Sequence, residues 1–144
     1  MARPKRRRQY AVLPLAEVDG ETCVLLLTSR ETGRWIIPKG WPVKRLKPWE
    51  AAAREAYEEA GLLGTVGLDP VGTYLYDKRL DNGRTVVVEV TVFPMAVRQQ
   101  LEDWPERGER RSRWVTPGQA AMLVEEGGLV DMLLETANGL SPAG

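Results

Sequence analysis

Histidine is absent from the 144 residues of this chain, and cysteine occurs once, at Cys23. The lack of histidine excludes Ser-His-Asp and Cys-His nucleophilic schemes and every zinc site that includes histidine. Any metal must therefore be held by oxygen ligands, which favours Mg²⁺, Mn²⁺ or Ca²⁺. A lone cysteine cannot form an internal disulfide, so we interpret Cys23 as a small core residue in a protein of the reducing cytosol.

Long uncharged hydrophobic runs are also missing. No stretch approaches the roughly 18 apolar residues of a membrane-spanning helix, so we expect no membrane-spanning segment. The chain begins with basic residues, as an export signal does, but Pro14 and Glu17 interrupt the apolar segment that follows. The sequence therefore predicts a cytoplasmic protein.

Acidic residues are lacking at positions 1–8, which hold Arg3, Lys5, Arg6, Arg7 and Arg8. Because the whole chain balances 20 basic against 20 acidic residues, the remainder is net acidic. We interpret residues 1–8 as a basic flexible tail. The alternative is a tail that contacts nucleic acid or a polyanionic substrate.

The chain has 144 residues, 43% of them hydrophobic, which makes it long enough to bury one core and too short for two domains. We therefore predict a single domain at residues 9–138, followed by a disordered tail at 139–144. The oligomeric state stays open, a homodimer included.

Apolar, partly β-branched runs predict strands at 9–15 and 22–28, joined by a turn at 17–21 as an antiparallel pair. Residues 35–37 predict a short strand. Glycine, proline and charged residues then indicate a loop at 39–47.

The firmest structural prediction is a helix that follows this loop. Pro48 suits a first helical turn, and the charge of Glu50 favours the positive end of the helix dipole. Alanine recurs up to Ala60, and Gly61 is placed to end the helix with a left-handed cap.

The second half of the chain is predicted to contain both strands and helices. Asn82-Gly83 suits a tight turn between strands at 65–76 and 84–93. Next we expect a charged loop at 99–111, a strand at 112–115, a helix from Thr116 to about Glu126, a break at Gly127-Gly128, and a helix at 129–137. This order favours an α/β fold, a mixed sheet with helices packed on its faces.

Three glutamates in the first helix lie three and four residues apart: Glu55, Glu58 and Glu59. This spacing presents their carboxylates to one patch of the helix surface. A solvated acidic face is the ordinary interpretation of such a row. The surrounding sequence, however, favours a metal site over a solvated acidic face.

Gly40 is followed, after thirteen residues, by the run Arg-Glu-Ala-Tyr-Glu-Glu-Ala-Gly-Leu at 54–62. This arrangement resembles the Nudix box, in which a glycine-bearing loop leads into an Arg-Glu and Glu-Glu helix. The resemblance departs at Leu46, where the box has glutamate, and at Ala56, which is smaller than the usual aliphatic residue. Glu50 lies four residues beyond Leu46 and is the alternative source of the missing carboxylate.

The resemblance implies a Nudix-like α/β/α sandwich and a Mg²⁺-dependent hydrolase, with Mn²⁺ as the alternative ion. It implies that Glu55 and Glu59 are the principal metal ligands, that the Gly40 carbonyl adds another, and that Glu58 is the base or water-orienting group. Arg54 would orient the neighbouring glutamates through charge-assisted hydrogen bonds. Because the missing glutamate supports the site in the family, Leu46 is expected to lower efficiency more than metal binding.

The similarity extends weakly over residues 9–135. Residues 35–40 look like the strand and loop of diphosphoinositol polyphosphate and diadenosine polyphosphate hydrolases, and 102–104 and 110–114 look like the former branch. Family members often recruit one more acid from a later loop. Glu109 is the candidate for that metal ligand, with Glu106 second.

Basic residues near the box are candidates for binding the substrate phosphates: Lys39, Arg34 and Arg30. Arg110, Arg111 and Arg113 would extend a positive rim, although any of these cations could equally be plain surface charge. Trp35 and Tyr74 are either base-stacking or core aromatics.

The leading hypothesis is a pyrophosphohydrolase acting on a small polyphosphate: a diphosphoinositol polyphosphate, a dinucleoside polyphosphate or a related nucleoside diphosphate derivative. The first alternative is a domain that binds such a ligand as a sensor without cutting it, because of Leu46. The second is an RNA 5′-end pyrophosphohydrolase that uses the basic tail to hold the strand.

Overall fold

A computed structural model describes residues 6–138 of the chain, so the predicted tail at 139–144 and the first five residues of the basic tail lie outside the described part. The elements are β1 Arg7–Val18, β2 Glu21–Thr28, β3 Trp35–Ile36, β4 Lys39–Gly40, α1 Pro48–Ala60, β5 Leu62–Val66, β6 Gly72–Arg79, β7 Thr85–Gln100, β8 Ser112–Val115, α2 Pro117–Leu123 and α3 Gly127–Ala137. No helix within residues 6–138 is long and apolar enough to span a membrane.

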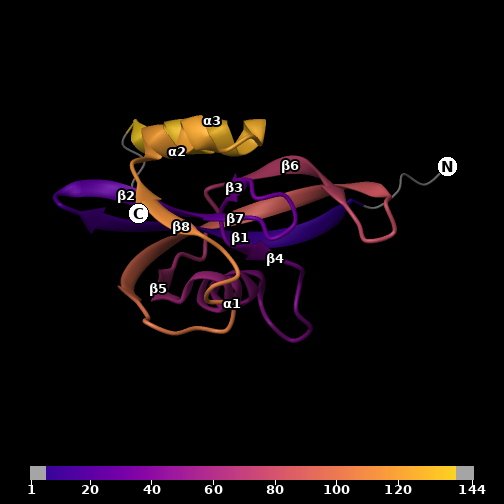
Figure 1. Cartoon of the computed structure of the whole chain (residues 1–144), viewed down its shortest axis with the longest axis horizontal. Coiled ribbons are helices and arrows are strands. Elements are labelled where there is room, and N and C mark those ends of the chain that lie inside the picture. The colour runs from indigo at the N-terminus through magenta and orange to yellow at the C-terminus, as the bar shows by residue number, and fades with distance from the viewer. Residues whose placement is uncertain (1–5, 139–144) are drawn as a thin grey trace.

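Strand β1 is the centre of the sheet. It pairs antiparallel with β2 and parallel with β7, which gives the order β3-β2-β1-β7-β5 in a sheet of eight strands within residues 6–138. Strands β4, β6 and β8 pair with β1, β7 and β2. Figure 1 shows α1 below the sheet and α2 and α3 above it. The predicted fold class, an α/β/α sandwich with a mixed sheet, is confirmed.

Alternate residues of the strands enter two separate cores. On β1, Ala11 and Leu13 pack in the cluster that contains Leu129 and Leu133 of α3, whereas Val12 packs in the cluster that contains Ala56 of α1. This is the period-two pattern of a strand that is buried on both faces. The antiparallel β1–β2 pair thus follows from two uninterrupted apolar runs.

Helix α1 has the predicted bounds. The Glu50 carboxylate accepts a hydrogen bond of 2.8 Å from the Lys47 backbone N–H, so Glu50 caps the helix and does not replace the carboxylate missing at Leu46. At the other end Gly61 adopts φ 68°, and its N–H donates to the Tyr57 carbonyl. A β-carbon at Gly61 would also overlap the ring of Trp104. Glycine is required there by both conformation and space.

Several predicted boundaries are wrong. The expected strand at 65–76 is divided into β5 and β6, with Pro70, which has no backbone N–H, between them. Strand β7 runs on to Gln100, because Gln100 pairs with Leu62 at the end of β5. The expected loop at 39–47 begins with β4, which pairs with β1.

The two ends of the predicted domain also differ from expectation. Arg7 and Arg8 were assigned to the flexible tail, but both pair with β7 as the first residues of β1. Gly127 and Gly128 were expected to break the chain and instead form the first turn of α3. A β-carbon at Gly128 would overlap Tyr74, so glycine allows α3 to approach the sheet closely.

Candidate metal and phosphate site

Two glutamates of α1, Glu55 and Glu59, lie beside the loop that enters the helix. Gly40 pairs with Tyr10 of β1, which fixes this loop against the sheet. The Glu55 side chain occupies the space next to Gly40, where a β-carbon would overlap its carboxyl group. A glycine is therefore needed at position 40 for Glu55 to lie where it does.

Glu59 is the most buried of these carboxylates, with 7% of its surface exposed. Its Oε1 accepts a hydrogen bond of 3.2 Å from the Lys39 backbone N–H, and its Oε2 lies 3.3 Å from Nη2 of Arg110. Burial raises the pKa of Glu59 to about 8, although the charge of Arg110 opposes this shift. Burial also raises the pKa of Glu55, and the nearby charge of Glu58 adds to that rise.

Glu58 is paired with an arginine of the same helix. Its carboxylate accepts a hydrogen bond of 2.7 Å from Nε of Arg54, one helical turn earlier. The Glu58 backbone carbonyl accepts a hydrogen bond of 3.0 Å from the Glu106 N–H. This bond fixes the loop between β7 and β8 onto α1.

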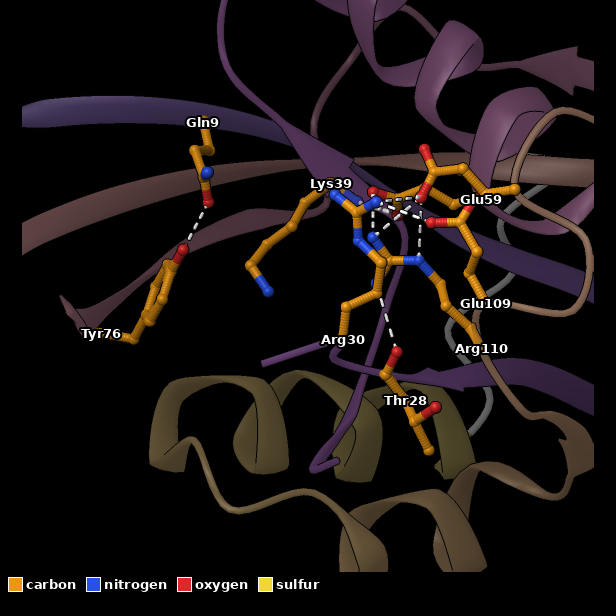
Figure 2. A network of polar contacts seen from close by, with 9 residues as sticks. Gln9, Thr28, Arg30, Lys39, Glu59, Tyr76, Glu109 and Arg110 are labelled. Carbon is orange, nitrogen blue, oxygen red and sulfur yellow. Dashed lines mark hydrogen bonds and ion pairs between the residues drawn. The ribbon is translucent and has the colours of Figure 1, made fainter. Parts of the chain in front are cut away.

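The Arg110 guanidinium joins this loop to the helix and the sheet. Besides Glu59 it binds Oε1 of Glu106, at 3.2 Å from Nη2, and it donates to the Thr28 carbonyl at 3.2 Å. Figure 2 shows Arg110 and Arg30 meeting the Glu59 and Glu109 carboxylates. Four charged side chains from three separate segments thus gather at one point.

A cation-rich pocket opens next to this network. It is lined by Gln9, Ser29, Arg30, Glu31, Ile36, Lys39, Glu59, Lys78 and Arg110. The Lys39 ammonium lies over the Tyr76 ring, 4.9 Å from its centroid, and burial lowers the Lys39 pKa. The Tyr76 hydroxyl donates to Oε1 of Gln9 at 2.6 Å, as Figure 2 shows. The arrangement can bind a multiply charged anion beside the α1 carboxylates.

The NUDIX domain family model matches residues 5–132, which is most of the chain. The chain belongs to the Nudix family. Nudix hydrolase 21 of Arabidopsis thaliana is 34% identical over 108 residues, which cover 74% of this chain and 52% of that protein. Diphosphoinositol polyphosphate phosphohydrolase 2 of Rattus norvegicus is 32% identical over 100 residues, covering 69% and 51%. This Nudix chain thus spans about half the length of these relatives.

Solved structures agree on the Nudix fold. The C. elegans Ap4A hydrolase covers 95% of this chain and 100% of its own, with a TM-score of 0.68 and 17% identity. The E. coli dihydroneopterin triphosphate pyrophosphohydrolase gives the same TM-score, 0.68, at 19% identity, over 94% of this chain and 98% of its own. At such identities the likeness concerns the fold alone.

Not all the predicted residues of the Nudix site meet in the structure. Lys39 and Arg30 line the pocket, whereas Arg34 pairs with Glu125 at 3.0 Å on an exposed surface. Glu109 pairs with Arg30 at 2.8 Å, while Glu106 shares Arg110 with Glu59.

Among the described residues, the pocket lining includes neither the predicted rim residues Arg111 and Arg113 nor the two aromatics, Trp35 and Tyr74. Arg111 and Arg113 lie over Trp35, at 5.8 and 6.0 Å from its ring centroid. Trp35 packs on the core that contains Tyr74, and Tyr74 is 3% exposed. The core interpretation of Tyr74 therefore holds.

Sequence reasoning missed Lys78, Gln9 and Tyr76. They come from β6 and β1, where alternate residues of a strand share a face, but nothing local shows which face meets the pocket. The Tyr76–Gln9 bond joins residues 67 positions apart. Only the sheet topology brings them together.

Within residues 6–138, no three acidic or sulfur side chains are arranged to hold a metal ion as they stand. Glu58 pairs with Arg54, and Glu59 pairs with Arg110. The donor set nevertheless suits a hard cation, because it offers carboxylate and carbonyl oxygens and no nitrogen or sulfur. Gly40 also leaves the space that the Glu55 carboxylate occupies.

Proposed function

We propose that this Nudix protein hydrolyses a phosphoanhydride bond in a small polyphosphorylated molecule, with Mg²⁺ as cofactor and Mn²⁺ as its substitute. The observation that carries the proposal is that Glu59 of α1 lines the same pocket as four cations, Arg30, Lys39, Lys78 and Arg110. The carboxylates suit a hard cation, and the pocket suits the phosphates. The family and the names of its relatives point the same way.

Glu55 and Glu59 would hold the metal together with the Gly40 carbonyl, with Glu58 contributing directly or through water. Of the two loop acids, Glu106 is favoured over Glu109, because Glu106 and Glu59 already bind the same nitrogen of Arg110. When bound, Mg²⁺ supplies charge neutralisation for the phosphates and lowers the pKa of a bound water.

Glu58 is proposed as the general base or water-orienting residue. It is less buried than Glu59, and its ion pair with Arg54 orients it. Arg54 is exposed at the edge of the site, so it acts by positioning Glu58. A carboxylate held this way can accept a proton from an attacking water.

The pocket favours a substrate dense in phosphate. Of the described residues that line it, four are cations, and the face of the neighbouring Tyr76 ring is covered by the Lys39 ammonium, 4.9 Å from the ring centroid. This composition favours a diphosphoinositol polyphosphate over a dinucleoside polyphosphate or another nucleoside diphosphate derivative. One relative is named for the first class of substrate and one structural neighbour for the second.

The test is phosphate release from these substrates with and without Mg²⁺. Glu58→Gln and Glu59→Gln should each lower kcat by about a hundredfold or more, because each removes a carboxylate charge from the reacting centre. Glu50→Gln is the matched control, since Glu50 is a glutamate of the same helix that only caps it. Equal turnover by the wild type, Glu58→Gln and Glu59→Gln proteins would contradict the proposal.

A second candidate is a sensor that binds the polyphosphate without cutting it. Leu46 favours it, because this residue replaces the first glutamate of the box and Glu50 is engaged as a helix cap. Calorimetry should then show binding while the substrate panel shows no turnover, and Leu46→Glu should create activity. Robust turnover by the wild type would exclude the sensor.

We also propose the cytosol as the compartment. Cys23 is free and buried, which suits a reducing environment. Several relatives are named as chloroplastic or mitochondrial proteins, so fractionation of cells expressing the tagged chain is the deciding measurement.

A further inference from the structure

Arg110 places a positive charge between two carboxylates of the site. Its Nη2 lies 3.3 Å from Oε2 of Glu59 on α1 and 3.2 Å from Oε1 of Glu106 on the following loop. The side chains of Arg110 and Glu59 are only 9% and 6% exposed. One nitrogen thus bridges a buried acid, Glu59, and a partly buried one, Glu106, whose side chain is 19% exposed.

The guanidinium is held firmly while it bridges them. Its Nε also donates to Glu106 at 3.3 Å, and its Nη1 donates to the Thr28 carbonyl at 3.2 Å. Without such a partner, two adjacent carboxylates with little access to water would repel each other at a high cost. Arg110 is therefore the counter-ion of the site when no metal is bound.

A divalent cation and Arg110 compete for the same oxygens. Oε1 of Glu59 accepts the Lys39 backbone N–H, so Oε2, which Arg110 binds, is the oxygen most open to an incoming ion. A guanidinium and a metal ion on one carboxylate oxygen would repel each other strongly in a site with little water. The Arg110 side chain also lines the pocket beside Arg30 and Lys39, so it has another anion site within reach.

We propose that Arg110 is an exchangeable counter-ion, which holds Glu59 and Glu106 together in the metal-free protein and releases both carboxylates when a divalent cation binds. The released guanidinium then faces the substrate pocket. This inference rests on the proposed function, because it takes the α1 carboxylates as the metal site. It implies that metal binds before the substrate phosphates and that Arg110 lowers the affinity for metal.

The test is Mn²⁺ affinity, measured by electron paramagnetic resonance of the free ion under argon. All the proteins are titrated at one mildly alkaline pH, so that protons compete with the ion for the carboxylates as little as possible. Arg110→Gln should bind Mn²⁺ on the order of tenfold more tightly than the wild type, because the ion no longer displaces a charge-assisted hydrogen bond. Arg110→Lys keeps the charge but loses the several donors of the guanidinium. Its Mn²⁺ affinity should lie between that of the wild type and that of Arg110→Gln.

Arg30→Gln is the matched control for loss of a nearby charge. Arg30 binds Glu109 at 2.8 Å and approaches Glu106 at 3.7 Å, but it makes no bond to Glu59. Its Mn²⁺ affinity should change by less than about threefold. Unchanged or weaker binding by Arg110→Gln, or an equal gain in Arg30→Gln, would overturn the inference.

A second readout uses the wild-type protein and does not depend on the variants folding. The Arg110 Nε–H, bonded to Glu106, should give a slowly exchanging signal in the ¹⁵N spectrum of the metal-free protein, and saturating Mg²⁺ should make it exchange rapidly. If Mg²⁺ binds and the signal persists, this inference is wrong while the metal site stands. If neither Mg²⁺ nor Mn²⁺ binds at all, the proposed function itself fails.

Discussion

The two faces of the sheet are covered by helices of opposite character. Helix α1 contributes small residues to its core, among them Ala52 and Ala56, whereas α3 contributes large ones, among them Leu129 and Leu133. Small side chains bury less apolar surface but let a helix lie close to the sheet. The α1 face thus brings carboxylates near the loop at Gly40, while the α3 face supplies stability.

The strongest test of this difference between the two faces is a substitution that affects the α3 core alone. Leu133→Ala should lower the free energy of unfolding by about 2–5 kcal/mol, because Leu133 is fully buried and its loss leaves a cavity. Mn²⁺ affinity of the folded variant should stay within about twofold of the wild type, since Leu133 belongs to the core opposite α1. Urea unfolding and Mn²⁺ titration check the two parts. A large loss of affinity would mean that the faces are coupled.

The two faces should also respond differently to pH. Because the folded-state pKa of Glu59 is raised to about 8, the folded protein binds this proton more tightly than the unfolded chain does. The stability of the metal-free wild type, relative to Glu59→Gln, should therefore fall as pH rises from about 5 to about 8, by at most about 1.4 kcal/mol per pH unit. Above that range the difference should level off.

The measurement is chemical unfolding of both proteins over this pH range, with Leu133→Ala as the control from the other face. Leu133→Ala removes no titratable group, so its difference from the wild type should be independent of pH. A wild-type stability that rises with pH relative to Glu59→Gln would contradict the raised pKa of Glu59.

Gly61 links α1 to the loop that carries Glu106, because Trp104 of that loop packs on it. Gly61→Ala should cost about 2 kcal/mol, since a β-carbon is strained at φ 68° and overlaps the Trp104 ring. Thermal unfolding measures this cost. Gly83 is the control: it also has positive φ, but a β-carbon there meets nothing, so Gly83→Ala should cost less. Equal costs would show that the Trp104 contact is unimportant.

The smallest effect is expected at the start of α2, far from the carboxylates. The Thr116 hydroxyl accepts a hydrogen bond of 3.2 Å from the Gln119 N–H, which completes a capping box. Thr116→Ala should lower stability by about 1 kcal/mol and leave the metal affinity unchanged. Thr116→Ser keeps the hydroxyl and should restore most of that stability. A loss in both variants would assign the effect to packing.

The sequence predicted those features of the fold and the site that depend on neighbouring residues. Pro48 and Gly61 gave the bounds of α1, and the row of glutamates gave its acidic face. The apolar runs of β1 and β2 gave an antiparallel pair, since each run is buried on both sides of the sheet. These features depend on residues close together in the chain.

What the sequence could not supply comes from long-range pairing. Arg110 and Glu59 are 51 residues apart, and their ion pair depends on how the loop after β7 crosses α1. Lys78 reaches the pocket only because β6 pairs with β7, which in turn pairs with β1. The division of the expected strand at 65–76 is of another kind, because Pro70 is a local signal for the break that the prediction overlooked.

The parallel pairing of β1 with β7 has a consequence for synthesis of the protein. Of the described strands β1 is made first and its longest partner, β7, lies at residues 85–100, so the middle of the sheet stays open until residue 100 has emerged. During that interval the strand partners available to β1 are β2 and the short β4. Chaperone binding to the nascent chain should therefore be concentrated on β1 and should end once β7 has been made.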